Sequence, residues 1–188
     1  MALAAFTKTC GAHVPGIQEL WLWERSNFTS AAMTSNELTG TALAATGGVQ
    51  IIPDIDGIEV NQTLTSDKNG KSFWEKNIII NTSNIYSEAV KLIRDILSVS
   101  PCGLIAAYKT NNGTWWVSGL EYESATTLSC DRGLYLGSSE IKTGKAPEDD
   151  DADMILLTLQ GNFPQADYIV IPDGGAITVS ATGIAVAA

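Results

Sequence analysis

The chain has 188 residues, 45% of them hydrophobic, a length and composition that suit one domain with a substantial core. The formal charge is −10, from 21 acidic and 11 basic residues, which argues against nucleic-acid binding by phosphate neutralisation. The cysteines Cys10, Cys102 and Cys130 have no paired spacing, so we expect buried free thiols and neither a disulfide framework nor a zinc cluster.

The N-terminal third contains one clear strand pattern. Residues 17–24 (IQELWLWE) alternate in the manner of a strand, with apolar side chains on both faces, so we expect both faces to be covered. Residues 28–48 are rich in Ser, Thr, Ala and Gly, which predicts a long loop.

The middle of the chain predicts a hairpin followed by a helix. Residues 58–64 and 73–80 alternate as two strands, and the polar stretch between them has Asn69-Gly70 at its tip. Residues 84–98 place apolar side chains at helical spacing, with Ser83 or Asn84 as the N-cap and Pro101 beyond the end.

Three further strand-like runs follow the helix: GLIAAYKT, GTWWVSGLEYES and, later, DADMILLTLQG. Asn111-Asn112-Gly113 predicts a hairpin between the first two. Residues 172–188 carry no charge after Asp173 and predict a terminal strand or an arm beyond a domain of residues 1–171. This order of elements predicts a mainly β (α+β) fold, a two-sheet sandwich or partial barrel with one flanking helix.

The titratable residues predict no catalytic or metal site. The acids of the run PEDDDADM are consecutive with no glycine inside it, which favours a solvated acidic loop over a calcium loop. His13 is the only histidine and lies in a Gly/Pro-flanked stretch, a poor place for a rigid general base. No phosphate loop or dinucleotide fingerprint is present, so we expect neither an enzyme nor a cofactor.

Trp115 and Trp116 must point to opposite faces of the strand that carries them. One is expected to enter the core, and the other to be exposed or covered by a neighbour. An exposed tryptophan could stack on a sugar. We favour the interpretation that the two tryptophans pack in the core and at a subunit interface.

The order of elements over residues 50–171 resembles the tail tube proteins (major tail proteins) of long-tailed bacteriophages. The resemblance lies in the strand–hairpin–strand unit, the single helix, and the run GLIAAYKTNNGTWWVSGLEYESATTLSCDRG followed by DADMILLTLQGNFPQADYIV. The matching motifs are Asn112-Gly113, Gly119-Leu120, and Asp153 before the strand that ends at Gly161. Residues 28–48 and the tail after Asp173 match nothing in that pattern.

The resemblance implies a virion structural protein that assembles into six-fold rings, stacked into a tube through which DNA is ejected. Its partners would be further copies of itself and other tail proteins, with DNA passing without specific binding and no membrane span. The acidic balance would give a non-adhesive lumen. The subunit-interface candidates are Trp115, Trp116, Asp67, Lys68, Asn69, Gly70, Ile177 and Val179. The acidic lumen or loop candidates are Glu148, Asp149, Asp150, Asp151 and Asp153.

Two alternatives stay open. The chain could be another virion subunit, such as a neck, tail terminator or decoration protein. It could also be a carbohydrate-binding β-sandwich module that uses Trp115 or Trp116.

Overall fold

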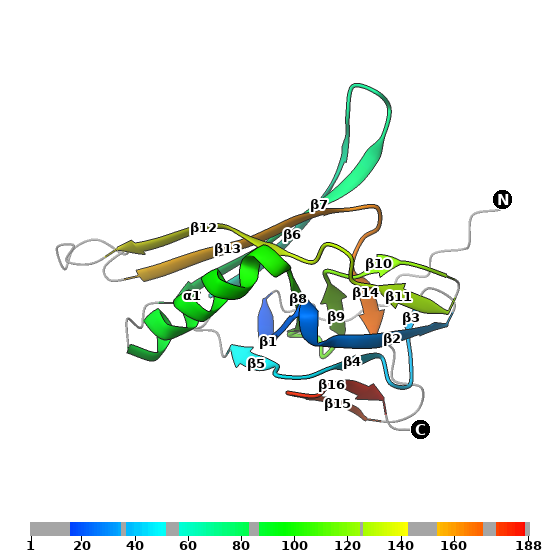
Figure 1. Ribbon diagram of the computed structural model, residues 1–188, viewed down its shortest axis with the longest axis horizontal. Helices are drawn as coiled ribbons and strands as arrows, with labels where there is room; N and C mark the ends of the chain where they lie inside the picture. The colour runs from blue at the N-terminus through cyan, green and yellow to red at the C-terminus, as the bar shows by residue number, and fades with distance from the viewer. Residues whose placement is uncertain are drawn as a thin grey trace.

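The computed structural model describes residues 16–34, 37–51, 57–82, 87–124, 126–142, 154–170 and 176–186. Within them the fold is mainly β, with two sheets and one α-helix, which confirms the predicted fold class (Figure 1). A four-stranded sheet has the order β12-β13-β7-β6. A curled sheet of twelve strands has the main order β15-β16-β4-β2-β3-β14-β9-β8-β1-β5, with β11 joining β10 to β2.

The strands of the curled sheet are mostly short. In chain order they are β1 (Ile17–Glu24), β2 (Phe28–Thr34), β3 (Glu37–Leu38), β4 (Leu43–Ala45), β5 (Val49–Ile51), β8 (Leu104–Thr110), β9 (Trp115–Ser118), β10 (Glu121–Tyr122), β11 (Thr127–Ser129), β14 (Tyr168–Val170), β15 (Ile177–Ser180) and β16 (Gly183–Val186). Two 3₁₀ turns, Arg25–Asn27 and Ser100–Cys102, follow β1 and the α-helix.

The four-stranded sheet contains the longest strands and is antiparallel throughout. Its members are β6 (Ile58–Ser66), β7 (Ser72–Thr82), β12 (Tyr135–Lys142) and β13 (Met154–Phe163). The helix α1 (Ser87–Val99) follows β7, and its Ile93 and Ile96 are buried against this sheet and the curled one. The predicted helix is thus confirmed. The predicted N-cap residues, Ser83 or Asn84, lie outside the described residues.

Strands β1 and β8 lie between two hydrophobic cores. Trp23 and Ile105 enter the core inside the curled sheet, whereas Leu20 and Leu104 enter the core shared with the four-stranded sheet and α1. Both faces of β1 are therefore covered, as the mixed pattern of residues 17–24 predicts.

Residues 28–48 correct the sequence prediction of a long loop. They form β2, β3 and β4, and their buried side chains include Ala31, Met33 and Leu43. The segment is made of small Ser, Thr and Ala side chains, whose weak alternation hides a strand. Strand β2 pairs with β3 and β4 inside the segment, and distant partners complete the pairing, because β4 also pairs with β16 and β2 with β11.

The hairpin predictions are confirmed. Asn111-Asn112-Gly113 turns β8 into β9, with Gly113 at a φ of 83° and its N–H donating to the Thr110 carbonyl. The C-terminal segment, for which the sequence predicts a terminal strand or an arm, forms a hairpin over residues 177–186. This hairpin pairs with the chain's own β4 and buries Ile184 and Val186.

Candidate assembly surface

One face of the four-stranded sheet is covered by α1 and the curled sheet, and the opposite face is open. Because side chains alternate along a strand and partners in register share a face, the pairing assigns each residue to one side. None of the open-face residues whose burial the structure describes is buried. Those with polar side chains are Glu59, Asn61, Thr63, Thr65, Glu75, Asn77, Asn81, Ser138, Glu140, Thr158, Gln160 and Asn162.

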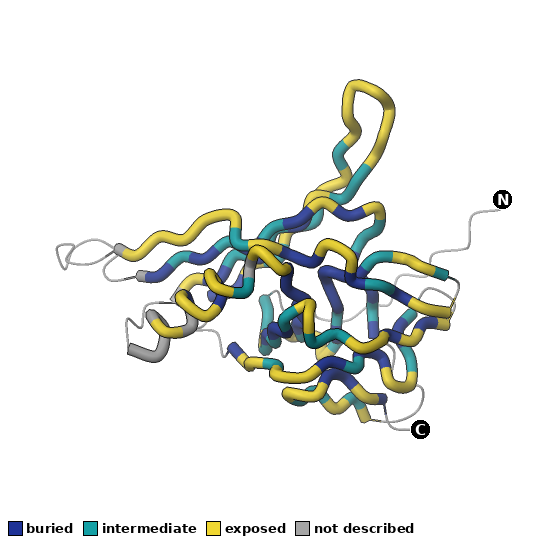
Figure 2. The backbone as a smooth tube through the Cα atoms, viewed as in Figure 1, coloured by how far each residue is buried: buried dark blue, intermediate teal, exposed yellow. Residues whose placement is uncertain are grey.

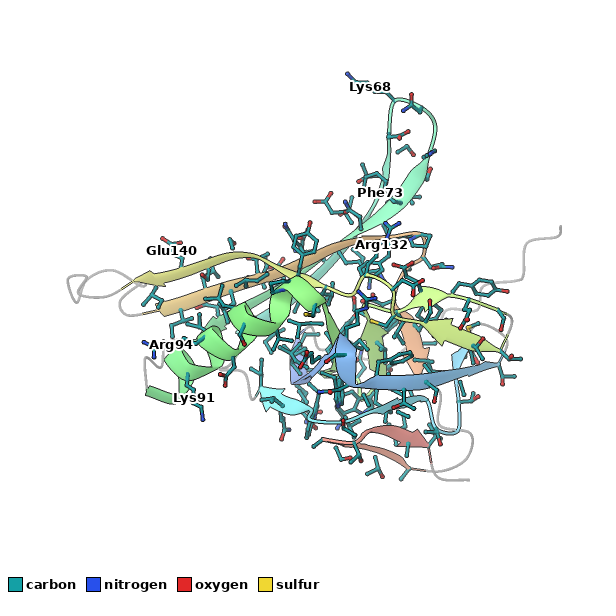
Figure 3. The ribbon with its side chains drawn as sticks, viewed as in Figure 1. Lys68, Phe73, Lys91, Arg94, Arg132 and Glu140 are labelled. Atoms are coloured by element: carbon teal, nitrogen blue, oxygen red, sulfur yellow. The ribbon has the colours of Figure 1, made fainter. Side chains whose placement is uncertain are left out.

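Among the side chains that the structure describes, the charged groups of this open face are acidic. Glu59, Glu75 and Glu140 lie on it, and no basic side chain that the structure describes does. In Figure 3, Glu140 lies above β12, on the side away from α1, which carries Lys91 and Arg94. The other described side chains of this face are amides, hydroxyls and a few apolar groups, so its described part holds no cation that would attract a phosphate.

Both edges of the sheet are free of strand partners among the described residues, since β6 and β12 each pair on one side only. The odd-numbered residues of β6 form the backbone hydrogen bonds to β7. This follows from the hydrogen bonds at the two ends of the pairing, from Asn81 N–H to Gly57 C=O and from Asp67 N–H to Lys71 C=O. The even-numbered residues, such as Val60 and Gln62, therefore direct their N–H and C=O groups to the open edge. Such an edge is a template for another strand.

The opposite edge, β12, is irregular and partly apolar. Its register with β13 shifts between Leu136 and Ser138, which places a bulge at Gly137. Tyr135 and Ile141 are large hydrophobic side chains that stay 45% and 48% exposed. An edge with exposed apolar side chains is suited to being covered by another chain.

A groove of about 710 Å³ runs beside β6 and is mostly apolar. Ile58, Val60 and Gln62 line one side, and Tyr108 and Trp116 of the curled sheet line the other. If a strand of another chain paired with β6, every second side chain of that strand would lie on the covered side of the sheet, next to this groove.

The β6–β7 hairpin projects beyond both sheets, and its tip is exposed (Figure 2). Asp67 organises the tip, because its Oδ1 accepts hydrogen bonds from the N–H groups of Asn69 (2.8 Å) and Lys71 (2.9 Å). Gly70 has a φ of 78°, a conformation that favours glycine. The predicted interface residues Asp67, Lys68, Asn69 and Gly70 thus lie together on a defined, protruding turn.

The other predicted residues are placed as follows. Trp115 is buried inside the curled sheet, and Trp116 is half-buried at the groove, which confirms that they face opposite ways. Ile177 and Val179 are half-buried against the chain's own core. His13, Cys10 and the acids Glu148, Asp149, Asp150, Asp151 and Asp153 lie outside the described residues.

The thiol prediction is correct for one described cysteine and wrong for the other. Cys130 is buried, its thiol donates to the Gly119 carbonyl at 3.3 Å, and burial raises its pKa to about 12. Cys102 is exposed, because it sits in the 3₁₀ turn that leaves the helix.

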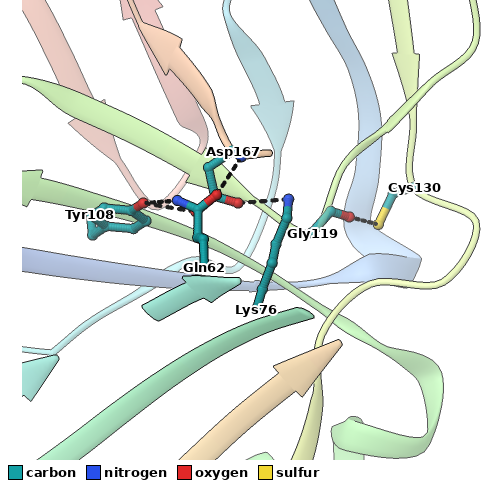
Figure 4. Close-up of polar contacts among 6 residues, drawn as sticks. All are labelled: Gln62, Lys76, Tyr108, Gly119, Cys130 and Asp167. Atoms are coloured by element: carbon teal, nitrogen blue, oxygen red, sulfur yellow. Dashed lines mark hydrogen bonds and ion pairs between the residues drawn. The ribbon is translucent and has the colours of Figure 1, made fainter. Parts of the chain in front are cut away.

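Sequence reasoning missed a buried polar cluster at the junction of the two sheets: Gln62, Lys76, Tyr108 and Asp167 (Figure 4). One feature of the sequence indicates this cluster. Lys76 lies between Trp74 and Ile78 on the covered face of β7, and a lysine at such a position needs a buried acidic partner.

In the described part of the chain, no helix has the length and apolarity needed to cross a lipid bilayer. The described residues also contain no group of three or more His, Cys, Asp or Glu side chains that could hold a metal ion. In comparisons with known proteins, no family model, no curated protein and no solved structure matches this chain.

Proposed function

We propose that the chain is a tube-forming virion subunit of the tail tube type, whose four-stranded sheets join edge to edge around a lumen. The observation that carries the proposal is the four-stranded sheet itself. It combines two free edges with one open, acidic and uncovered face.

The strand directions fit ring closure. Three successive antiparallel pairings make β6 and β12 run in opposite directions. Copies related by rotation about an axis along the tube would therefore bring β6 of one copy antiparallel to β12 of the next. Ring closure then removes every free edge of the sheet.

The two faces of the sheet fit a tube wall. When copies are related by rotation about the tube axis, the covered faces of their four-stranded sheets all point the same way. The curled sheets and the α1 helices would then lie on the outside of the ring. The face with Glu59, Glu75 and Glu140 would then line the lumen. The carboxylates would repel the phosphates, and neutral amides and hydroxyls add no charge that attracts them, so DNA would pass without strong binding.

The protruding hairpin tip supports stacking of rings. Asp67 fixes the turn, and its neighbours Lys68 and Lys71 are exposed cations on an otherwise acidic chain. A tip directed along the tube axis would meet the adjacent ring. The role proposed for the protein is therefore a structural one in the virion tail.

The test is negative-stain electron microscopy of the purified chain over a range of concentrations. Hollow tubes or six-fold rings support the proposal. Rings that never stack favour a neck or terminator position, and particles that stay monomeric at all concentrations and with tail-initiator proteins added contradict it.

A carbohydrate-binding role rests on one observation, the half-buried Trp116 at the apolar groove. Trp115 is buried and can stack on no sugar. Quenching or enhancement of tryptophan fluorescence by glycans, lost in Trp116→Ala, would favour this second function.

A further inference from the structure

Lys76 and Asp167 meet where the two sheets join, sealed from solvent. Lys76 Nζ lies 2.7 Å from Asp167 Oδ1, and the two side chains are 1% and 0% exposed. Lys76 belongs to β7, and Asp167 lies directly before β14. The ring of Phe163 stands 4.4 Å from Nζ, so the amine has an apolar aromatic wall beside its acidic partner.

The second oxygen of the Asp167 carboxyl is also fixed. Tyr108 donates its hydroxyl proton to Oδ2 at 2.7 Å, and Gln62 Nε2 donates to the Tyr108 oxygen at 3.1 Å. Gln62 Oε1 in turn accepts from the Asp167 backbone N–H at 2.9 Å. These contacts, drawn in Figure 4, hold the carboxyl plane and leave Oδ1 directed at the amine.

Burial disfavours the charged form of Lys76. Burial lowers the pKa of Lys76, although the negative charges of Asp167 and Glu121 act in the opposite direction. Transfer of one proton from the ammonium to the carboxylate would convert the ion pair into a neutral amine and a carboxylic acid, so that neither buried side chain carries a charge. A neutral amine is a nucleophile, and a carboxylic acid has a hydroxyl that can leave.

We propose that Lys76 and Asp167 condense into an intramolecular amide bond. The Nζ lone pair attacks the Asp167 carboxyl carbon, and the oxygen held by Tyr108 takes the negative charge of the tetrahedral intermediate. The bond from carbon to Oδ1 then breaks, and Oδ1 leaves as water with the acid's own proton and one proton from nitrogen. Nothing is oxidised or reduced, and no co-reactant is needed.

Two features of the site promote this step. The reacting groups are already in contact, which removes the entropic cost of bringing them together. Tyr108 is placed on the oxygen that becomes the oxyanion, where a fixed donor stabilises the transition state most.

The bond would join β7 of the four-stranded sheet to the segment that enters the curled sheet at β14. It would close a covalent loop from residue 76 to residue 167 and so restrict the unfolded chain, as a disulfide over a long loop does. The inference is independent of the proposed assembly, since it concerns one chain and its mass.

The test is the mass of the full-length chain under denaturing conditions, followed by peptide mapping. We expect a mass lower by one water than the sequence requires, and a branched peptide that joins Lys76 to Asp167. Lys76→Met is the matched control, and its mass should equal that of its own sequence. Tyr108→Phe keeps the ring but removes the hydroxyl, so linkage should be about a hundredfold slower and visible as a slow loss of water over time.

A wild-type chain with the full sequence mass and linear peptides at both residues would overturn the proposal, whether or not the variants fold. Because the chain is measured unfolded, this result does not depend on whether it forms rings.

Discussion

Trp115 and Trp116, adjacent in the chain, pack on opposite sides of β9. Trp115 is buried inside the curled sheet, with the Lys109 ammonium 5.8 Å from its ring centre, and Trp116 borders the groove beside the free edge of β6. Trp115 belongs to the core inside the curled sheet, whereas Trp116 packs against the core shared by the two sheets and stays half-buried.

Substitution separates these two roles. Trp115→Ala should lower the free energy of unfolding by about 3–5 kcal/mol, because it empties a core position. Trp116→Ala should lower the free energy of unfolding by less than half as much, but it should weaken assembly. Trp116→Phe should keep both the stability and the assembly of the wild-type chain. Urea unfolding and sedimentation velocity measure the two effects, and normal assembly of Trp116→Ala would exclude a role at the interface.

Proline at Val60 should block assembly and leave the chain folded. The Val60 N–H points to the open edge of β6, so proline removes no bond to β7 but cannot donate to an incoming strand. Val60→Thr keeps both the branched shape and the N–H, and is the control. Circular dichroism should match for the two variants, and only Val60→Thr should form rings; assembly of Val60→Pro would rule out pairing at this edge.

Reversing charge on the open face should make assembled particles retain DNA. Glu59→Lys combined with Glu75→Lys should raise retention of short DNA at low salt by about tenfold or more, with the effect lost as salt increases. Asp95→Lys makes the same kind of change on the exposed side of α1 and should retain little. Equal retention by both variants in a pelleting assay would show that the open face does not line the channel.

The hairpin tip should control stacking and not folding. Asp67→Ala removes the acceptor of two backbone hydrogen bonds, which are worth about 1 kcal/mol each, and should give shorter tubes from normal rings. Asp67→Asn keeps the Oδ1 acceptor and should give normal lengths in electron micrographs. If Asp67→Ala forms tubes of unchanged length, the hairpin tip does not contribute to the contact between rings.

Stability should fall in alkaline solution. Burial raises the pKa of Cys130 and of Tyr168 to about 12 each, above the ordinary values of 9.0 and 10.0. The folded chain therefore holds protons that the unfolded chain has released, so this stabilisation is complete below pH 9 and is lost as pH rises towards 12. Urea midpoints between pH 8 and pH 11 should fall, less steeply in Cys130→Ala; a flat profile would contradict the assignment.

The parts of the fold that sequence could predict are those with strong local signals. The long strands β6, β7 and β13 alternate clearly, Asn-Gly pairs mark both hairpins, and α1 has helical spacing. Residues 28–48 were missed because their small side chains alternate weakly and because two of their strand partners, β11 and β16, are distant in sequence.

The candidate surface could be predicted only in part. The hairpin tip and the division between Trp115 and Trp116 follow from turn chemistry and strand alternation. The open face depends on the register among β12, β13, β7 and β6, which a shift by one residue would reverse. The pairing of Lys76 with Asp167 joins residues that no local pattern connects.

The most direct test of the tube proposal is a cryo-electron microscopy reconstruction of the assembled particle. We expect a closed β-barrel in which β6 of each copy pairs antiparallel with β12 of the next, with Glu59, Glu75 and Glu140 facing the lumen. An assembly whose lumen is lined by the curled sheet or by basic side chains, or one held together without β6–β12 pairing, would contradict it.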